Sequence, residues 1–326
     1  MDPAGEKTVS TTPTRAGPEL DPEAGLPEDE GMQSSASDGS DLRKPAHHNR
    51  DGAFDGSFAG TARRKTQVYV RPWYRRRDYF TEGWTDASIW RAATVEAFAT
   101  ALLVYLTGQF GITLMSYGVT QILGYVGIWN TVLLSVFIYA AAPASGGHLN
   151  PTITWATMLT GLCPAPRGVL YLIFQTLGGA LAGGLLRGSW GTERAVSHMG
   201  GGCVFDPATI SPGQVFITEV VSSWAILFLG FGAGLDPRQA LVFGPQLGPL
   251  LVGLSLGVVS SATTGTAPGY TGASANPARC FGLAVARGSF PNHWVWWVGP
   301  AVAGICHSIM YHFAPPYHAE VKPQER

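Results

Sequence analysis

The stretch HLNPTITWATMLTG, residues 148–161, places an asparagine–proline pair at the start of a short apolar run. Proline suits the first position of a helix because its φ is preset, and asparagine is a favoured N-cap. A second pair opens SANPARCFGLAVARG, residues 274–288. Each pattern predicts a helix of about ten residues, which covers about 15 Å, or half of a hydrocarbon core of about 30 Å. Two such half-helices that meet end to end would together cross a membrane.

The chain around the two pairs carries apolar runs of membrane-spanning length. A spanning helix needs about 20 mostly apolar residues. The sequence predicts six spans, at residues 90–111, 122–143, 168–188, 213–233, 241–264 and 294–314. We therefore expect an all-α membrane protein, in which one half-helix lies between spans two and three and the other between spans five and six.

The two halves of the chain resemble each other. Glu96 begins EAFATALLVYLTG in the first span of one half, and Glu219 begins EVVSSWAILFLGFG in the first span of the other. Asn150 lies 54 positions after Glu96, and Asn276 lies 57 positions after Glu219. Because each half has three spans, the second half crosses the membrane in the opposite direction. The sequence predicts inverted repeats over residues 88–188 and 212–314.

Composition divides the chain into a membrane domain and two tails. Residues 1–60 are rich in Pro, Gly, Ser, Thr and acidic residues, a composition that predicts disorder. We expect a disordered tail over residues 1–83, the membrane domain over 84–315 and a short second tail over 316–326. Basic residues gather where the first tail meets the membrane, which predicts that both termini are cytoplasmic. These residues are Arg63, Arg64, Lys65, Arg71, Arg75, Arg76 and Arg77.

Residue spacing argues against an enzyme or a metal protein. The four cysteines and eight histidines do not cluster with metal-ligand spacing. The sequence contains no nucleophile elbow, phosphate-binding glycine loop or paired carboxylates. We therefore expect no enzymatic activity, no cofactor, no metal and no nucleic-acid partner.

The two Asn-Pro pairs predict a pore constriction. Helix N-termini that face each other at mid-membrane each carry about half a positive charge. If the side-chain carbonyls of Asn150 and Asn276 are bonded locally, their NH₂ groups point into the lumen as donors. A passing water gives its oxygen to both donors, so its hydrogens point away and a proton wire is interrupted. The pattern therefore predicts passage of small neutral solutes and exclusion of protons and ions.

These features resemble the major intrinsic protein family, the aquaporins and glycerol facilitators. The resemblance covers residues 88–312 and rests on SGGHLNP, YTGASANPAR and the two glutamates. It implies an aquaporin-like fold, with one pore in each subunit of a homotetramer in the lipid bilayer, and small neutral solutes as partners. The plasma membrane is the location we expect. The implied pore constriction consists of Asn150, Pro151, Thr152, Asn276, Pro277 and Ala278.

Two features narrow the resemblance to the X intrinsic proteins of plants and fungi. Cys280 directly follows Asn-Pro-Ala-Arg, and Cys203 ends a Gly-Gly-Cys triplet. Thr152 stands where most members have alanine, and it either narrows the lumen or bonds back to its helix. Cys280 is either a small buried apolar residue or a reactive thiol. Cys203 is a candidate for pairing with the same cysteine of neighbouring subunits.

The resemblance also implies a selectivity filter of four residues. Counting from the motifs without gaps places it at Asn130, Thr264, Ala273 and Arg279, and one gap would move the first to Trp129 or Thr131. Arg279 is suited to bind hydroxyl or water oxygens and to repel cations, whereas the alternative is a loop arginine near the surface. Thr264 and Ala273 are small, so the opening is predicted to be wider than in water-selective members. Expected solutes are glycerol, urea, hydrogen peroxide and water.

Four polar residues are expected to support the pore. Glu96 and Glu219 are predicted to accept backbone N–H bonds from the half-helix loops rather than to carry protons. Gln175 is expected to support them. His148 either lines the pore or hydrogen-bonds within its loop, and the sequence favours neither.

Two other functions fit parts of the sequence. A secondary transporter also uses inverted repeats, although it normally needs titratable or ion-binding groups at its core. A scaffold protein with a closed pore would act through its N-terminal tail. Solute flux without ion coupling separates a channel from both.

Overall fold

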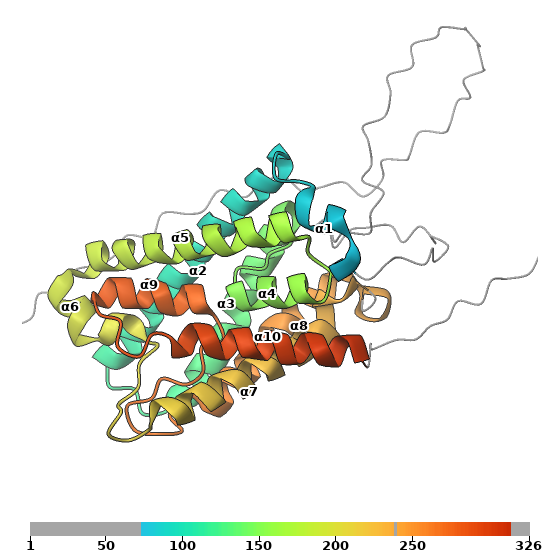
Figure 1. Cartoon of the computed structure of the whole chain (residues 1–326). Coiled ribbons are helices and arrows are strands. Elements are labelled where there is room, and N and C mark those ends of the chain that lie inside the picture. The colour runs from blue at the N-terminus through green and yellow to red at the C-terminus, as the bar shows by residue number, and fades with distance from the viewer. Residues whose placement is uncertain (1–72, 238–239, 314–326) are drawn as a thin grey trace, which may run out of the picture. The chain divides into compact units, whose positions relative to one another are not determined.

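The computed structural model describes residues 73–237 and 240–313, and the regular structure in these ranges is helical (Figure 1). The six predicted spans correspond to α2 (Ala87–Ser116), α3 (Ile122–Ser145), α5 (Ala165–Trp190), α7 (Pro212–Gly230), α8 (Ala240–Thr263) and α10 (Val295–Phe313). Within the described ranges, five helices are long and apolar enough to cross a membrane. The sixth, α10, carries His307 and His312 and is not among the five. The predicted all-α class is confirmed.

The two Asn-Pro pairs begin short helices as predicted. Helix α4 (Pro151–Leu159) has 9 residues and α9 (Pro277–Arg287) has 11. Each begins with proline, and the asparagine before it caps the helix through its side-chain oxygen. This oxygen satisfies one of the backbone N–H groups that a helix N-terminus leaves unpaired.

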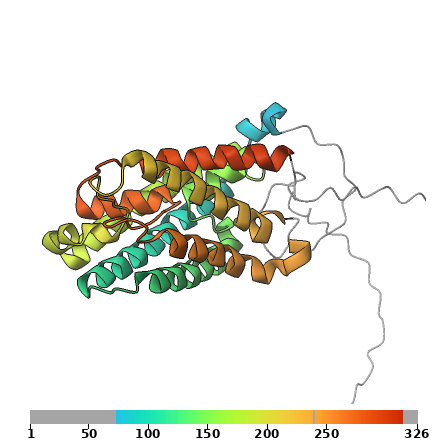
Figure 2. The ribbon, with the colours of Figure 1, turned by 90° about the horizontal axis from the view of Figure 1, so that it is seen from below.

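The half-helices lie along the middle of the helix bundle, between α5 and α10 (Figure 1). Helix α4 runs from the middle toward the end that carries α1 (Arg77–Thr81), and α9 runs toward the end that carries α6 (Thr192–Ser197). We call these the α1 end and the α6 end. The long helices run side by side along the same direction (Figure 2). The half-helix N-termini therefore meet near mid-bundle.

Helix pairing follows the repeats. The first and third spans of each repeat pack together, α2 on α5 and α7 on α10, while the second spans, α3 and α8, join the two repeats. Close approaches depend on glycine: a Cβ on Gly179 of α5 would lie 2.3 Å from the carbonyl oxygen of Ala278 in α9. Any larger residue would push α9 away from α5, so this contact fixes the depth of the second half-helix.

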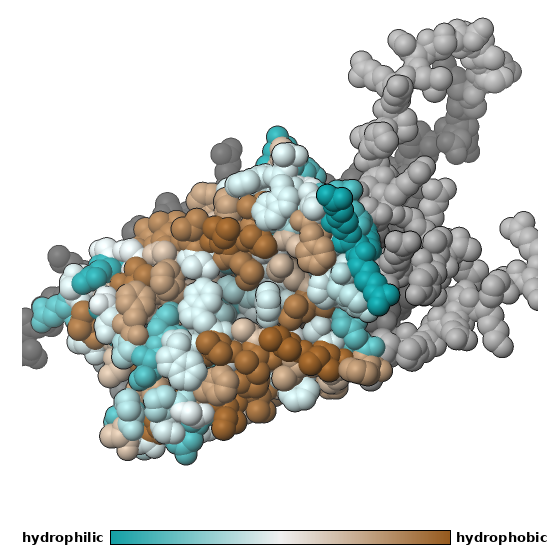
Figure 3. All heavy atoms as spheres, viewed as in Figure 1, coloured by the Kyte–Doolittle hydropathy of each residue, from teal (hydrophilic) through white to brown (hydrophobic). Residues whose placement is uncertain are grey.

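The flank of the bundle is apolar, and hydrophilic residues gather toward its two ends (Figure 3). Large apolar side chains on this surface are widely exposed, as for Ile128 at 70% and Phe98 at 61%. Such exposure is unfavourable in water but suits contact with lipid chains.

The expected boundary of the N-terminal tail is wrong. Residues 73–83 were expected to be disordered, but they contain η1 (Trp73–Arg75) and α1. The buried Tyr79 donates hydrogen bonds to the carbonyl oxygens of Met158 and Cys163, each at 2.6 Å. These tertiary contacts order a segment whose local composition does not predict structure. The disorder expected for residues 1–72 and the tail expected at 316–326 lie outside the described residues.

Candidate pore and its constriction

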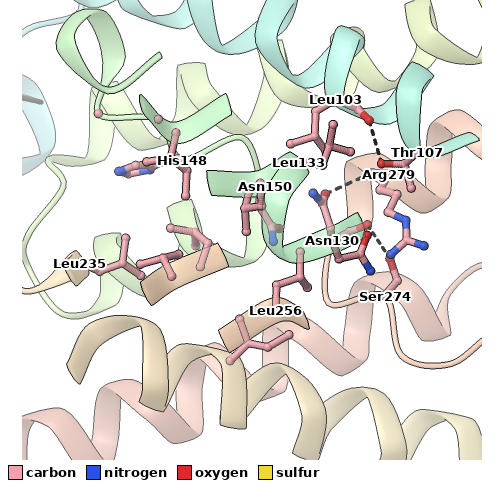
Figure 4. A pocket seen from close by; sticks show the side chains of 18 residues that line it. Leu103, Thr107, Asn130, Leu133, His148, Asn150, Leu235, Leu256, Ser274 and Arg279 are labelled. Carbon is pink, nitrogen blue, oxygen red and sulfur yellow. Dashed lines mark hydrogen bonds between the residues drawn. The ribbon is translucent and has the colours of Figure 1, made fainter. Parts of the chain in front are cut away.

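A cavity lies between the half-helix loops and α2, α3 and α8, with residues of both repeats in its wall (Figure 4). From His148 the labelled side chains pass Asn150 and reach Asn130 and Arg279 at the other end. The rest of the wall is aliphatic apart from two glycines. A narrow polar track beside an apolar wall suits small solutes that exchange hydrogen bonds as they move. The polar track consists of Thr107, Asn130, His148, Asn150, Ser274, Asn276 and Arg279.

The two capping asparagines also join the repeats to each other. The Oδ1 atom of Asn150 accepts from the Thr152 backbone N–H at 2.8 Å, and that of Asn276 accepts from the Arg279 N–H at 3.1 Å. In addition, Asn150 Nδ2 donates to the Ala275 carbonyl at 2.8 Å, and Asn276 Nδ2 donates to the Leu149 carbonyl at 3.2 Å.

This arrangement adds a second role to the predicted one for the amides, because each amide also bonds to the opposite loop. Each NH₂ group has two hydrogens, and one of them bonds to the opposite loop. A single N–H of each amide therefore remains for the lumen, so the two asparagines together still offer the two donors that were predicted. The cross-bonds also hold the two half-helix tips together.

Glu96 anchors the first half-helix loop. One carboxylate oxygen accepts from Ser145 Oγ at 2.6 Å and from the His148 N–H at 3.0 Å. The other accepts from the Leu149 N–H at 2.6 Å and from Gln175 Nε2 at 2.8 Å. The geometry thus places Gln175 beside Glu96, as expected for a supporting residue.

His148 has both of the positions that the sequence left open. Its side chain lines the cavity, and its Nδ1 atom lies 3.1 Å from Thr154 Oγ1. Thr154 also exchanges hydrogen bonds with Gln175. His148 is therefore a wall residue whose ring is oriented by a buried network.

Glu219 holds the second loop with fewer contacts. It is fully buried and accepts from the backbone N–H groups of Ser274 at 2.6 Å and Ala275 at 3.1 Å. The two glutamates thus occupy matching positions, each bonded to the residue immediately before the capping asparagine.

Two of the four expected filter residues line the cavity. Asn130 and Arg279 are in its wall, and Asn130 Nδ2 donates to Ser260 Oγ at 2.9 Å. The side chains of the two alternatives to Asn130 make contacts outside the cavity wall. Trp129 stacks on Phe110 with ring centroids 4.6 Å apart, and Thr131 Oγ1 donates to a carbonyl of its own helix.

The other two expected filter residues are buried beside the cavity rather than in its wall. Thr264 Oγ1 bonds back to the Ser260 carbonyl at 2.7 Å, and the Ala273 N–H donates to Thr263 Oγ1. Neither Thr264 nor Ala273 is among the described residues that line the cavity. The place of Thr264 and Ala273 in the selectivity filter therefore stays a prediction.

Thr152 takes neither of its two predicted roles. It is buried and does not line the cavity, and its hydroxyl has no hydrogen-bond partner among the described residues. Pro151, Pro277 and Ala278 are also buried and form the helix starts rather than the wall.

The expectations for both cysteines are wrong. Cys203 and Cys280 form a disulfide within the chain, with Cα atoms 5.3 Å apart. Cys280 is therefore not a free thiol, and Cys203 is not available for pairing between subunits. The spacing could not show that the loop before α7 folds back on α9 and brings together residues 77 positions apart in the sequence. The remaining cysteines in the described ranges, Cys163 and Cys306, are free.

Several supporting residues were missed. Ser260, which holds Asn130, lies four positions before Thr264 on the same helix face, so helical spacing could have indicated it. Ser145 and Thr154 carried no comparable signal, because their partners Glu96 and Gln175 lie far away in the sequence.

The two half-helices meet at their capping asparagines, beside a polar track and inside a bundle of long helices. This arrangement defines a channel of the aquaporin type. The family model of the major intrinsic proteins matches residues 83–311, and the chain belongs to this family. The family resemblance drawn from the motifs is thereby confirmed.

Individual relatives agree with this assignment. The probable aquaporin TIP4-1 of Oryza sativa subsp. japonica is 34% identical over 236 residues, 69% of this chain and 87% of the relative. Aquaporin TIP4-1 of Zea mays is 38% identical over 190 residues, 58% of this chain and 69% of the relative. The aquaglyceroporin structure from Plasmodium falciparum shares the fold, with a TM-score of 0.58 at 20% identity over 68% of this chain and 95% of that one.

Membership in the family establishes the broad function. The chain is an integral, multi-pass membrane protein and a passive channel for water and small neutral solutes. Its family consists of channels rather than enzymes.

Proposed function

We propose that this channel conducts small neutral polar solutes, namely glycerol, urea and hydrogen peroxide as well as water, and excludes protons and ions. The observation that carries the proposal is the pair Asn130 and Arg279 in one cavity wall. Arginine supplies only donors, whereas Asn130 supplies an acceptor, its Oδ1 atom, and its amide is held by the bond from Nδ2 to Ser260. A hydroxyl or amide solute needs both kinds of partner.

Proton exclusion is assigned to the constriction. The bonds from each Nδ2 atom to the opposite loop leave one N–H of Asn150 and one of Asn276 for the lumen, and both half-helix N-termini direct their positive ends toward it. A water there donates to neither side chain, so a continuous proton wire is interrupted. Arg279 adds a second positive barrier.

The test is solute uptake by proteoliposomes in which the purified chain is reconstituted. We expect Arg279→Ala to change the glycerol-to-urea permeability ratio by on the order of tenfold, because the guanidinium contacts each solute differently. Asn130→Ala should lower permeation by glycerol more than permeation by water. Cys306→Ser, at a free cysteine outside the cavity wall, is the matched control. Equal ratios in all of these proteins would contradict the assignment of the filter.

The assembly and subfamily are part of the proposal. Cys280 after Asn-Pro-Ala-Arg and the Gly-Gly-Cys triplet support the X intrinsic subfamily. The widely exposed apolar flank supports a homotetramer embedded in lipid. Light scattering of the purified protein should give four times the subunit mass of 34.6 kDa. A monomeric mass would contradict the tetramer.

Two cellular membranes are candidates for the location of this channel. The sequence led us to expect the plasma membrane with cytoplasmic termini, whereas similarity to the aquaporins named TIP favours a vacuolar membrane. In both cases the α1 end is proposed to face the cytoplasm. A fluorescent fusion of the full chain distinguishes the two membranes.

A further inference from the structure

The loop before α7 has a backbone conformation that residues with a Cβ atom rarely adopt. We call residues 199–203 the glycine loop. All five residues have positive φ: Met199 54°, Gly200 69°, Gly201 95°, Gly202 146° and Cys203 52°. Such a conformation is disfavoured at Met199 and Cys203, so it persists only where the surrounding structure holds it.

The glycine loop is wedged between α2 and α9. A Cβ on Gly200 would lie 2.1 Å from the carbonyl oxygen of Leu283 in α9. A Cβ on Gly201 would lie 2.6 Å from the carbonyl oxygen of Gly108 in α2. Atoms do not approach so closely, and only glycine fits at these two contacts. The loop is therefore in direct backbone contact with the half-helix that carries Arg279.

Packing, rather than a partner atom, limits the direction of the Arg279 guanidinium. A Cβ on Gly202 would lie 3.9 Å from Arg279 Nη2, which places the loop beside the charge. The Nε atom of Arg279 is buried and has no hydrogen-bond partner within residues 73–237 and 240–313. A guanidinium with few fixed bonds takes its orientation from the walls around it.

A disulfide links the glycine loop covalently to α9. Cys203 ends the glycine loop, and Cys280 directly follows Arg279 in the chain. The backbone at Arg279 is thus fixed on one side by Asn276, which accepts its N–H, and on the other by the bond from Cys280 to the loop.

We propose that the Cys203–Cys280 disulfide positions the Arg279 guanidinium by holding the glycine loop as a fixed wall of the filter. Without the bond, the loop relaxes from its disfavoured conformation and the guanidinium gains room. The filter then discriminates less against larger solutes. Cys203 and Cys280 are positioning residues, and the inference rests on the filter role proposed above for Arg279.

The readout must separate positioning from simple stabilisation. A disulfide that only stabilises the fold changes the yield and the melting temperature when it is lost. It leaves the ratio of two solute permeabilities unchanged, because both depend equally on the number of folded channels. We therefore use the glycerol-to-urea permeability ratio in proteoliposomes.

The experiment compares the full-length wild type with Cys203→Ala/Cys280→Ala. The matched control is Cys163→Ala/Cys306→Ala, which removes the two free cysteines and keeps the disulfide. We expect the ratio to rise several-fold, on the order of three- to tenfold, in the first double variant and to stay at the wild-type value in the control. Mass spectrometry of non-reduced peptides establishes which bond each sample contains.

Reduction and reoxidation of the wild-type protein form a second experiment, which tests the proposal even if the double variant does not fold. Reduction by an excess of a dithiol reagent, which gives two electrons and two protons to the S–S bond and itself becomes a disulfide, should raise the ratio, and hydrogen peroxide should restore it. In the restoring step the two thiols lose two protons and two electrons to form the S–S bond, and the peroxide O–O bond breaks to give two waters. The cross-linked peptide should disappear and return in step with the ratio.

Two results would overturn the proposal: a wild type without the cross-linked peptide, or an unchanged ratio in protein shown to lack the bond. The role of Arg279 is tested separately by Arg279→Ala. If that variant alters the ratio while loss of the disulfide does not, only the positioning fails. If Arg279→Ala also leaves the ratio unchanged, the proposed filter itself fails.

Discussion

The two half-helix loops hold matching asparagines by different chemistry. In the first repeat, a buried polar network surrounds Glu96: Ser145 and Gln175 bond its carboxylate, and Gln175 bonds Thr154 in turn. In the second repeat, within the described residues, Glu219 accepts from two backbone N–H groups and a disulfide secures the half-helix. Both repeats must hold a helix-capping asparagine near mid-bundle, and they do so with two different sets of contacts.

The difference follows the expected redox environment of each end. Disulfides persist in oxidising compartments and are rare in the cytosol. The Cys203–Cys280 bond belongs to the half-helix that runs toward the α6 end, and the predicted topology places that end away from the cytoplasm. The polar network belongs to the half-helix that runs toward the α1 end. If the predicted topology holds, the disulfide lies on the side of the membrane where such a bond persists.

Replacing each glutamate tests the comparison with the largest expected effect. Glu96→Gln puts an NH₂ group among buried donors and should lower the free energy of unfolding by about 2–5 kcal/mol, since each unpaired buried donor costs about 1–3 kcal/mol. Glu219→Gln, with two donors instead of four in the described residues, should lose about 1–3 kcal/mol.

Thermal unfolding of the purified variants measures both losses. The solute ratio of the protein that does fold should equal that of the wild type. Normal yield and stability of Glu96→Gln together with lost transport would instead indicate that this carboxylate takes part in conduction.

Removing the disulfide makes the second repeat depend on its hydrogen bonds alone. Cys203→Ala/Cys280→Ala should lose about 2–4 kcal/mol of stability, because the bond closes a long loop in the unfolded chain. The loss should also appear in the wild type on reduction. Melting curves with and without reductant check this, and identical curves would show that the bond does not stabilise the second loop.

The far ends of the half-helices offer a smaller test. Tyr79 donates to two carbonyls at the end of α4, while α9 ends at Gly288 in a left-handed conformation. Tyr79→Phe removes the hydroxyl and should lower the free energy of unfolding by about 1–2 kcal/mol, because the carbonyls lose a buried donor. Limited proteolysis of residues 73–83 should become faster. Phe80→Ala, at an exposed side chain on the same helix, is the control.

The smallest effect is expected where one repeat is made to match the other. Thr152→Ala gives the first pair the Asn-Pro-Ala sequence of the second. The Thr152 hydroxyl is buried without a partner among the described residues, so its removal should leave stability unchanged or raise it by about 1 kcal/mol. Water and glycerol permeabilities should stay within about twofold of the wild type. A large change in either would mean that Thr152 faces the lumen after all.

Local rules predicted the elements of the fold but not their tertiary partners. Helix capping explains the Asn-Pro pairs, and bilayer thickness explains the length of the apolar runs. The structure has both the short helices and the long ones that these features predicted. Counting from the motifs without gaps also identified Asn130 and Arg279, and both residues line the cavity.

The errors share a physical cause. The disulfide and the ordered Tyr79 segment each depend on how loops distant in sequence fold against the helices. No periodicity in the chain encodes such contacts. Helical spacing could have found Ser260, but the glycine loop needed three-dimensional information.

The most direct test of the central claim measures solute and proton flux together in proteoliposomes that contain a pH-sensitive dye. The account predicts that a glycerol or urea gradient drives unsaturable flux without any change of internal pH. It also predicts that an imposed pH gradient does not accelerate this flux. Saturable uptake that acidifies the lumen, or that requires a proton or sodium gradient, would contradict a passive pore interrupted at Asn150 and Asn276.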